Sequence, residues 1–149
     1  MNLKESNILV IDDDEDVLTA LRLLLKSIVK EVVVNKNPNT IHSLLEKGNF
    51  DIVILDMNFN GLVHTGNEGI YWLKKIKDYS SKIDVILITA YGDIDLAIKS
   101  LKEGASDFLV KPWKNEKLIE TIQQILKKKQ TDKLQNIQTR KGQKIIGES

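Results

Sequence analysis

Residues that could do chemistry follow four of the apolar runs in this 149-residue chain. They are Asp12, Asp13, Asp56, Thr89 and Lys111. Carboxylate oxygens are the ligands that Mg²⁺ prefers, and an aspartate can attack phosphorus to form an acyl phosphate. An ammonium group can neutralise the charge of phosphoryl oxygens in such a transfer. Each residue alone has a plainer structural interpretation, such as a helix cap or a solvated lysine. Their combination predicts a phosphoryl-transfer site that binds a hard divalent cation.

The apolar pattern predicts the elements that would position these residues. Short runs rich in β-branched residues, without polar alternation, are typical of parallel strands buried on both faces. Such runs occur at 8–11, 32–34, 52–55, 85–88 and 108–110. Apolar residues spaced by three or four positions predict helices within 17–28, 41–45, 70–76, 94–101 and 118–126.

Five strands that alternate with five helices predict an α/β fold, a doubly wound five-stranded parallel sheet with helices on both faces. Ligands bind such sheets beyond the carboxyl ends of the strands. Local signals support the helix boundaries. Asp14 is expected to cap the first helix, with Asp16 in its first turn, and Asn37 with the proline after it is expected to begin the second. Gly48 and Gly104 are expected to end helices.

The composition excludes several classes of protein. The absence of cysteine rules out disulfides, thiolate metal sites and a cysteine nucleophile, and two histidines are too few for a multi-histidine metal site. No apolar run is long enough to span a bilayer, and the first residues do not form a signal peptide, so we expect a soluble cytoplasmic domain without membrane contact. Residues 127–149 are basic, but they lack interleaved aromatic residues and a DNA-reading motif. We interpret them as a linker that does not bind nucleic acid directly.

The order and spacing of four motifs resemble the receiver domain of two-component response regulators. The motifs are Val10-Ile11-Asp12-Asp13, Val53-Ile54-Leu55-Asp56, Ile88-Thr89-Ala90 and Phe108-Leu109-Val110-Lys111-Pro112. The resemblance covers about residues 6–128. It implies a flavodoxin-like strand order of 2-1-3-4-5.

The resemblance also implies a role for each acidic position. Asp56 would accept a phosphoryl group from a cognate histidine kinase or from a small phosphodonor. Mg²⁺ would be held by Asp12, Asp13, Asp56 and the backbone carbonyl of Asn58, with Asp13 the more direct ligand of the acidic pair. The chain would therefore be a signalling receiver with Mg²⁺-dependent phosphoryl transfer and autodephosphorylation, not a turnover enzyme.

The remaining motif residues would carry the response to phosphorylation. Thr89 would hydrogen-bond one phosphoryl oxygen and Lys111 would pair with another, while Phe108 stands at the family's switch aromatic position. The resemblance implies a cis bond between Lys111 and Pro112. The surface of the fourth helix, fifth strand and fifth helix, which includes Ile94 and Tyr91, would then change. We expect this surface and the basic linker to form a homodimer whose arrangement controls the following domain.

One segment departs from the family pattern. The usual proline and glycine after the phosphorylated aspartate are replaced by Asn60 and His64, and the matching glycine is Gly69. The loop 59–68 is therefore about five residues longer than usual. We interpret His64 as a solvated loop residue; contact with the phosphate or a metal is the alternative.

The carboxyl-terminal segment suggests a larger context. We expect a receiver domain over 1–128, and a basic linker helix with the start of a truncated output domain over 129–149. The ending 145–149 resembles the opening of the central ATPase domain in sigma-54-dependent, nitrogen-regulation-type transcriptional activators. Downstream ATPase and DNA-binding domains would then be partners of the receiver.

Other functions fit the sequence less well. A haloacid-dehalogenase-type phosphatase needs a second carboxylate where Asn58 stands, and a dinucleotide site needs glycines where three aspartates follow the first strand. A calcium loop fails because Val17 and Leu23 occupy positions that need glycine and glutamate. The alternative that stays open is a stand-alone receiver that acts as a phosphate relay or a protein-interaction module.

Overall fold

The computed structural model describes residues 1–57, 67–90 and 93–146 of the chain. The strands are β1 (Asn7–Ile11), β2 (Glu31–Asn35), β3 (Ile52–Asp56), β4 (Asp84–Thr89) and β5 (Asp107–Val110). The helices are α1 (Glu15–Leu25), α2 (Ile41–Lys47), α3 (Asn67–Tyr79), α4 (Ile94–Lys102) and α5 (Asn115–Ile146). Two short 3-10 turns, η1 (Leu3–Glu5) and η2 (Pro38–Thr40), precede β1 and α2.

The five strands form one parallel sheet in the order β2-β1-β3-β4-β5. This confirms the predicted α/β class and the 2-1-3-4-5 order. All five predicted strands and all five predicted helices are present, with ends that differ by a few residues. Because the strands are parallel, their carboxyl ends lie at one edge of the sheet, where the candidate site residues follow them.

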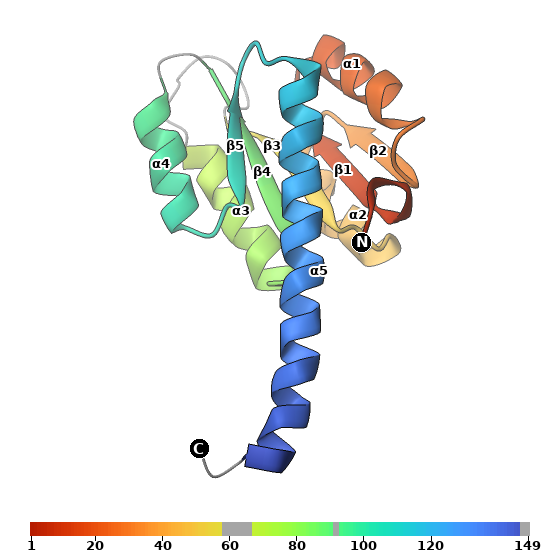
Figure 1. Cartoon of the computed structure of the whole chain (residues 1–149). Helices are drawn as coiled ribbons and strands as arrows, with labels where there is room; N and C mark the ends of the chain where they lie inside the picture. The colour runs from red at the N-terminus through yellow and green to blue at the C-terminus, as the bar shows by residue number, and fades with distance from the viewer. Residues whose placement is uncertain (58–66, 91–92, 147–149) are drawn as a thin grey trace.

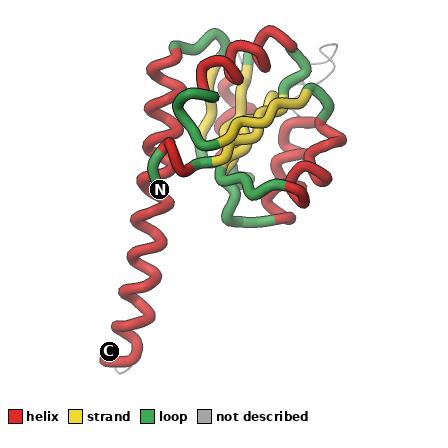
Figure 2. Tube along the Cα trace, turned by 90° about the vertical axis from the view of Figure 1, so that its right-hand side faces the viewer, coloured by secondary structure: helices red, strands yellow, loops and turns green. Residues whose placement is uncertain are grey.

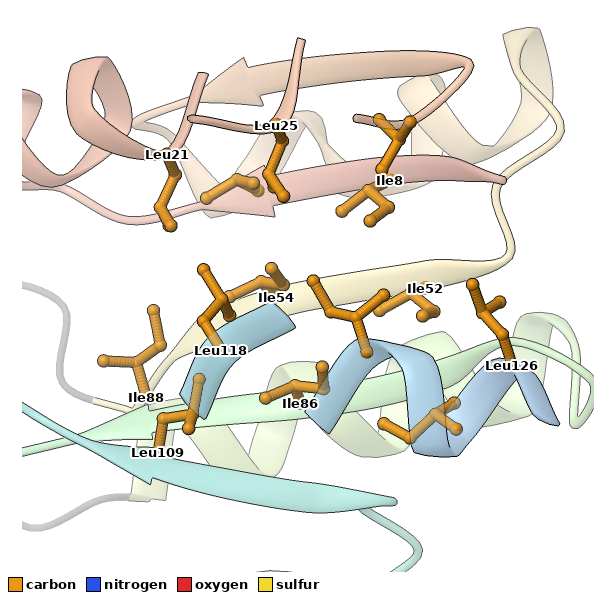
Figure 3. Close-up of a cluster of buried hydrophobic side chains, with 14 of the residues drawn as sticks. Ile8, Leu21, Leu25, Ile52, Ile54, Ile86, Ile88, Leu109, Leu118 and Leu126 are labelled. Atoms are coloured by element: carbon orange, nitrogen blue, oxygen red, sulfur yellow. The ribbon is translucent and has the colours of Figure 1, made fainter. Parts of the chain in front are cut away.

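Helices α1 and α5 cover one face of the sheet (Figure 1). Leu21 of α1 and Leu118 and Leu126 of α5 are almost completely buried, and they pack in one cluster with Ile54 and Ile86 of the central strands (Figure 3). Removal of this much apolar surface from water is the main force that holds both helices in place.

Helices α2, α3 and α4 cover the opposite face. Ile41 of α2 and Leu73 and Ile76 of α3 form a second buried cluster with Val53 and Leu87 of the sheet. In the side view the strands lie between the helices of the two faces (Figure 2). The predicted covering of both faces is therefore confirmed.

The expectation that every strand is buried on both faces was wrong for the edge strands. The residues of β2 are half-buried or exposed, and in β5 only Leu109 is buried. Both strands have a single neighbour in the sheet, so their outer side faces solvent. A β-branched run such as 32–34 therefore does not distinguish an edge strand from a central one.

The helix boundaries follow the predicted signals. The Asp14 carboxylate accepts a hydrogen bond from the Asp16 backbone N–H at 2.9 Å, as an N-cap does. Asn37 caps the 3-10 turn that leads into α2, and Gly48 follows the last residue of α2. Gly104, with φ of +112°, follows α4 in a left-handed conformation that favours glycine.

Helix α4 exposes part of its apolar stripe. Ala97 and Ser100 face the protein, whereas Ile94, Ile98 and Leu101 are exposed by 42%, 45% and 38%. Their spacing of four and three residues places these three side chains along one side of the helix. The helix therefore presents an apolar strip to solvent.

Helix α5 continues as one helix well past Leu126, as predicted, and projects away from the body of the molecule (Figure 2). It is held where it leaves the sheet: Lys129 Nζ lies 3.1 Å from Asp84 Oδ2, and the amino group of Met1 donates to Gln130 Oε1 at 2.7 Å. Within the described ranges, the helices lack the combination of length and apolar character needed to cross a membrane.

Candidate functional site

The carboxyl ends of β1 and β3 bring three carboxylates together. Ile11 pairs with Leu55, so Asp12, which follows β1, lies beside Asp56, the last residue of β3. One oxygen from each of Asp12, Asp13 and Asp56 lies within 4.8 Å of the other two. Asp12 and Asp56 are buried and Asp13 is exposed. The group can therefore be reached from solvent through Asp13.

Lys111 brings a positive charge to this group from β5. Its backbone N–H donates to the Thr89 carbonyl at 2.8 Å, which extends the pairing of β4 and β5. Its Nζ lies 3.2 Å from Asp12 Oδ2 and 3.8 Å from Asp56 Oδ1. The bond that follows, to Pro112, is cis, as the resemblance implied. The ammonium therefore sits between the two buried carboxylates.

The charges in this group change one another's titration. Burial raises the pKa of Asp12 above its ordinary value of 3.8, although the Asp14 backbone N–H and the Lys111 ammonium both favour the ionised form. Burial alone would lower the pKa of Lys111, but the charges of Asp56 and Asp12 outweigh it and raise that pKa. Lys111 therefore stays positively charged, while a charged Asp12 is only partly compensated.

The residues present fit a hard divalent cation. Asp12 Oδ2 is buried and accepts no hydrogen bond from the described residues; its one close polar contact is the Lys111 ammonium. A buried carboxylate oxygen in that position has a lone pair left for a metal. The three carboxylates supply oxygen ligands only, which suits Mg²⁺ better than a softer metal.

Thr89 and Phe108 lie on the same face of neighbouring strands. Leu87 pairs with Phe108, and Thr89 lies two residues beyond Leu87, so the alternation of side chains places Thr89 and Phe108 on one side. Thr89 is completely buried and its hydroxyl donates to the Ala90 carbonyl at 3.3 Å. Phe108 is half-buried against the cluster beneath α2, α3 and α4. Thr89 and Phe108, the predicted switch pair, therefore lie near each other on neighbouring strands of the sheet.

Four positions that the sequence singled out, Asn58, Asn60, His64 and Tyr91, lie outside the described residues. The predicted loop 59–68 ends too late, because α3 already begins at Asn67. Glu68 stands in the first turn of that helix, where a negative charge is favourable next to the free N–H groups.

Two backbone contacts at the site were missed by reasoning from residue types. The Asp14 N–H donates to Asp12 Oδ1 at 2.9 Å and fixes one of the two carboxylate oxygens. The Gly69 N–H donates to the carbonyl of Met57, the residue after Asp56, at 3.0 Å. The first contact leaves no signal in the sequence, because any residue supplies an N–H. The contact between Gly69 and Met57 had a partial signal in the sequence, because a glycine permits a close approach of two backbones.

Comparison with known proteins supports the resemblance. The family model "Response regulator receiver domain" matches residues 8–123. The chain is 33% identical over 126 residues to the transcriptional regulatory protein ZraR of Klebsiella oxytoca, covering 85% of this chain and 27% of ZraR. It is 31% identical over 127 residues to the response regulator protein TodT of Pseudomonas putida, covering 85% of this chain and 54% of TodT. It thus spans between about a quarter and about a half of these relatives.

A solved structure agrees in fold and in sequence. The N-terminal signal receiver domain of a two-component system response regulator from Bacteroides fragilis superposes with a TM-score of 0.73 and is 46% identical. That match covers 81% of this chain and 96% of the other. Domains of this kind bind Mg²⁺ at an acidic pocket and serve generally as signalling proteins. The chain therefore belongs to the response regulator receiver domain family.

Proposed function

We propose that this chain is a phosphorylation-controlled receiver in which Asp56 accepts the phosphoryl group. The observation that carries the proposal is the gathering of Asp12, Asp13 and Asp56 within 4.8 Å, with the Lys111 ammonium beside two of them. Such a concentration of negative charge is unfavourable unless a cation and an ammonium compensate it. The same cation and ammonium would also neutralise the charge of an incoming dianionic phosphoryl group.

In the proposed transfer, a carboxylate oxygen of Asp56 forms a bond to phosphorus while the bond from phosphorus to the donor breaks. The donor is a phosphohistidine of a histidine kinase, which regains its imidazole lone pair, or a small acyl phosphate, which leaves as a carboxylate. The product is an acyl phosphate on Asp56, and water later hydrolyses it to restore the carboxylate.

Other groups of the chain orient and neutralise the phosphoryl oxygens. The Lys111 ammonium, which pairs with the Asp56 carboxylate before the transfer, would pair with a phosphoryl oxygen after it. Lys111 stays charged because its pKa is raised. Asp12 and Asp13 would hold Mg²⁺ together with Asp56 and the Asn58 carbonyl. When bound, Mg²⁺ would neutralise phosphoryl oxygens and reduce the repulsion among the carboxylates.

Intact-mass spectrometry with acetyl phosphate and Mg²⁺ tests the proposed acceptor. We expect one phosphoryl adduct on the wild-type chain, none on Asp56→Asn, and none on the wild type in excess chelator. Asp78→Asn is the matched control, because Asp78 is exposed in the last turn of α3, and it should be labelled like the wild type. An unchanged adduct on Asp56→Asn would contradict the assignment.

We propose that Thr89 and Phe108 transmit the modification. When the Thr89 hydroxyl turns from the Ala90 carbonyl to a phosphoryl oxygen, it vacates space on the face that it shares with Phe108. Inward movement of Phe108 then changes the surface formed by α4, β5 and α5. The phosphoryl group biases an existing equilibrium between two arrangements and contributes only its different interaction with each.

We propose a cytoplasmic transcriptional regulator as the larger context, with a receiver over 1–128 and a linker over 129–149. Support comes from the name of ZraR as a transcriptional regulatory protein and from the ending 145–149, which resembles the start of a sigma-54-type ATPase domain. The partners would be a cognate histidine kinase, a second copy of the chain, and downstream ATPase and DNA-binding domains. A stand-alone phosphate relay is the alternative, and the coding sequence after Ser149 distinguishes the two.

A further inference from the structure

Gly69, in the first turn of α3, touches the backbone of Met57 directly. A Cβ atom on Gly69 would lie 2.6 Å from Met57 Cα and 2.8 Å from the Met57 carbonyl oxygen. Real Cβ atoms essentially never approach another atom within 3.0 Å, and here the obstacle is backbone, which cannot rotate away. Only glycine therefore allows α3 to lie this close to Met57 without a shift of one of them.

The Met57 backbone is held from two sides. Its N–H donates to the Ile88 carbonyl of β4 at 2.9 Å, and its carbonyl accepts from the Gly69 N–H at 3.0 Å. Its side chain is completely buried in the cluster beneath α2, α3 and α4. Met57 therefore has a fixed position at the end of β3, and the first turn of α3 supplies one of its two backbone hydrogen bonds.

Met57 is the residue after Asp56, so its backbone is joined by one peptide bond to the residue that carries the carboxylate of the site. Adjacent Cα atoms are 3.8 Å apart across a trans peptide, and a displacement of one peptide unit is passed to the next residue. Asp56 has an oxygen within 4.8 Å of oxygens of Asp12 and Asp13, and its Oδ1 lies 3.8 Å from Lys111 Nζ. Tolerances of tenths of an ångström matter for metal coordination and for in-line attack.

We propose that Gly69 is a positioning residue of the phosphoacceptor site: its close contact with Met57 sets where the Asp56 carboxylate lies relative to Asp12 and Asp13. This inference rests on the proposed function. It assigns to the start of α3 a task at the site, although residues 58–66 separate it from β3 along the chain.

The chain offers a matched control for this proposal. A Cβ on Gly48, just after α2, would lie 2.6 Å from the Phe50 ring, the same nominal overlap as at Gly69. Gly48 precedes β3, whereas the site lies at the carboxyl end of that strand. Gly48→Ala therefore adds a Cβ at the same nominal distance at the opposite edge of the sheet, but against a side chain that can shift, and the unfolding measurement shows how much each substitution destabilises the fold.

The experiment compares Gly69→Ala, Gly48→Ala and the wild type as full chains. Urea unfolding gives the stability of each, Mg²⁺ titration by calorimetry gives metal affinity without any donor, and acetyl phosphate with Mg²⁺ gives the labelling rate. We expect Gly69→Ala to weaken Mg²⁺ binding and to slow labelling by at least tenfold, and Gly48→Ala to stay within twofold of the wild type in both. Wild-type Mg²⁺ affinity in folded Gly69→Ala would overturn the proposal.

Hydrogen exchange on the wild type keeps the proposal testable if Gly69→Ala does not fold. By linkage, if the Gly69–Met57 contact favours Mg²⁺ binding, Mg²⁺ must slow exchange of the Gly69 amide. Mg²⁺ binding also stabilises the fold as a whole, so exchange of the Gly48 amide, which donates to the Leu44 carbonyl at 2.9 Å, should slow by a smaller factor than exchange of the Gly69 amide. Equal effects on both amides, or none on Gly69, would overturn the proposal.

The Mg²⁺-binding measurements and the phosphoryl-labelling measurement separate this inference from the proposed function. A wild-type chain that binds Mg²⁺ but takes no phosphoryl group at Asp56 would end the proposed function, while the calorimetry and exchange results still decide the role of Gly69. A chain that binds no Mg²⁺ would overturn both.

Discussion

Asp12 is a buried carboxylate of the site whose pKa is raised. Its carboxylate is completely buried, one oxygen accepts a hydrogen bond from the Asp14 N–H, and the other lies 3.2 Å from the Lys111 ammonium. Burial raises its pKa, which means that folding without a metal disfavours the charged form of Asp12 relative to water. A cation bound at the proposed site would reduce this cost.

The sign of this shift predicts how stability depends on pH. A raised folded-state pKa contributes stability that is fully present below the unfolded value near 3.8 and is lost as pH rises through the folded value. At pH 7 in chelator, Asp12→Asn should therefore be more stable than the wild type, because the variant does not bury a charge at this position. The gain should disappear as pH falls below 3.8, where the wild-type carboxyl is neutral as well.

Urea unfolding at pH 7 and at a pH below 3.8 measures the difference in the free energy of unfolding between Asp12→Asn and the wild type. Asp132→Asn, an exposed position on α5, is the control and should show no comparable gain at pH 7. Added Mg²⁺ should stabilise the wild type more than Asp12→Asn. A variant less stable than the wild type in chelator at pH 7 would mean that the Lys111 ion pair outweighs burial.

Residue types were enough to predict that Asp12, Asp56 and Lys111 lie at one edge of the sheet, because each follows a recognisable strand. They were not enough to predict how close each pair is. Lys111 lies nearer to Asp12 than to Asp56, and this follows from the local path of the chain after β1 and β5. Roles for Asp56, Thr89 and Phe108 in phosphoryl transfer and switching stay predictions.

At the scale of elements, α5 depends on contacts at its point of exit. Up to Asp132, where the description of its side chains ends, the last buried residue of α5 is Leu126, and the sequence beyond it is largely polar. A polar helix without tertiary contacts is marginal in water. Asp84, the first residue of β4, provides such a contact. Its Oδ1 accepts a hydrogen bond from Ser106 Oγ at 2.7 Å, and its Oδ2 lies 3.1 Å from Lys129 Nζ. Lys129 also donates to the Lys82 carbonyl.

We predict that Lys129→Met loosens the helix beyond the sheet. The lost ion pair is partly buried, so the destabilisation should be about 1 kcal/mol. Amide hydrogen exchange over 130–140 should become several times faster than in the wild type. Lys128→Met removes a neighbouring exposed lysine and should leave these rates unchanged. Equal exchange in the two variants would show that Asp84 does not hold the helix.

Elements were predicted from the sequence more completely than the contacts between them. The spacing of Leu118, Ile122 and Ile125 predicted α5, and polar residues with sparse apolar ones predicted its continuation. The Asp84–Lys129 pair could not be predicted, since it joins residues 45 positions apart and many lysines could have served. The half-buried state of β2 was missed for a similar reason, because burial depends on neighbours that a run of valines does not specify.

For the whole molecule, we predict that phosphorylation favours a homodimer through the apolar strip of α4. Ile94, Ile98 and Leu101 are exposed along one side of this helix, next to the proposed switch strand β5. Contiguous exposed apolar residues of this kind are favourable to cover. In sedimentation equilibrium, the wild type should associate more strongly with Mg²⁺ and beryllofluoride, which imitates an aspartyl phosphate, than without them.

Ile98→Glu should remain monomeric in both conditions, because dimerisation would bury its charge. Leu23→Glu is the control: Leu23 is exposed by 52% on α1, away from α4, and this variant should associate like the wild type. Association of Ile98→Glu to the wild-type extent would place the dimer contact elsewhere.

Strand β4 ends at Thr89 beside the carboxylates and begins at Asp84 beside Lys129. The part of α5 beyond Lys129 reaches Ile146, which at 1.5 Å per residue is about 26 Å. In the proposed switch, this part of α5 would act as a lever arm that pivots where Lys129 contacts β4, the strand that also carries the Thr89 hydroxyl. A tilt of about 5° at the fulcrum moves the far end by about 2 Å, as in rigid-body switching. If two chains associate as proposed, a small adjustment of the Thr89 hydroxyl would become a displacement large enough to change how their α5 helices meet.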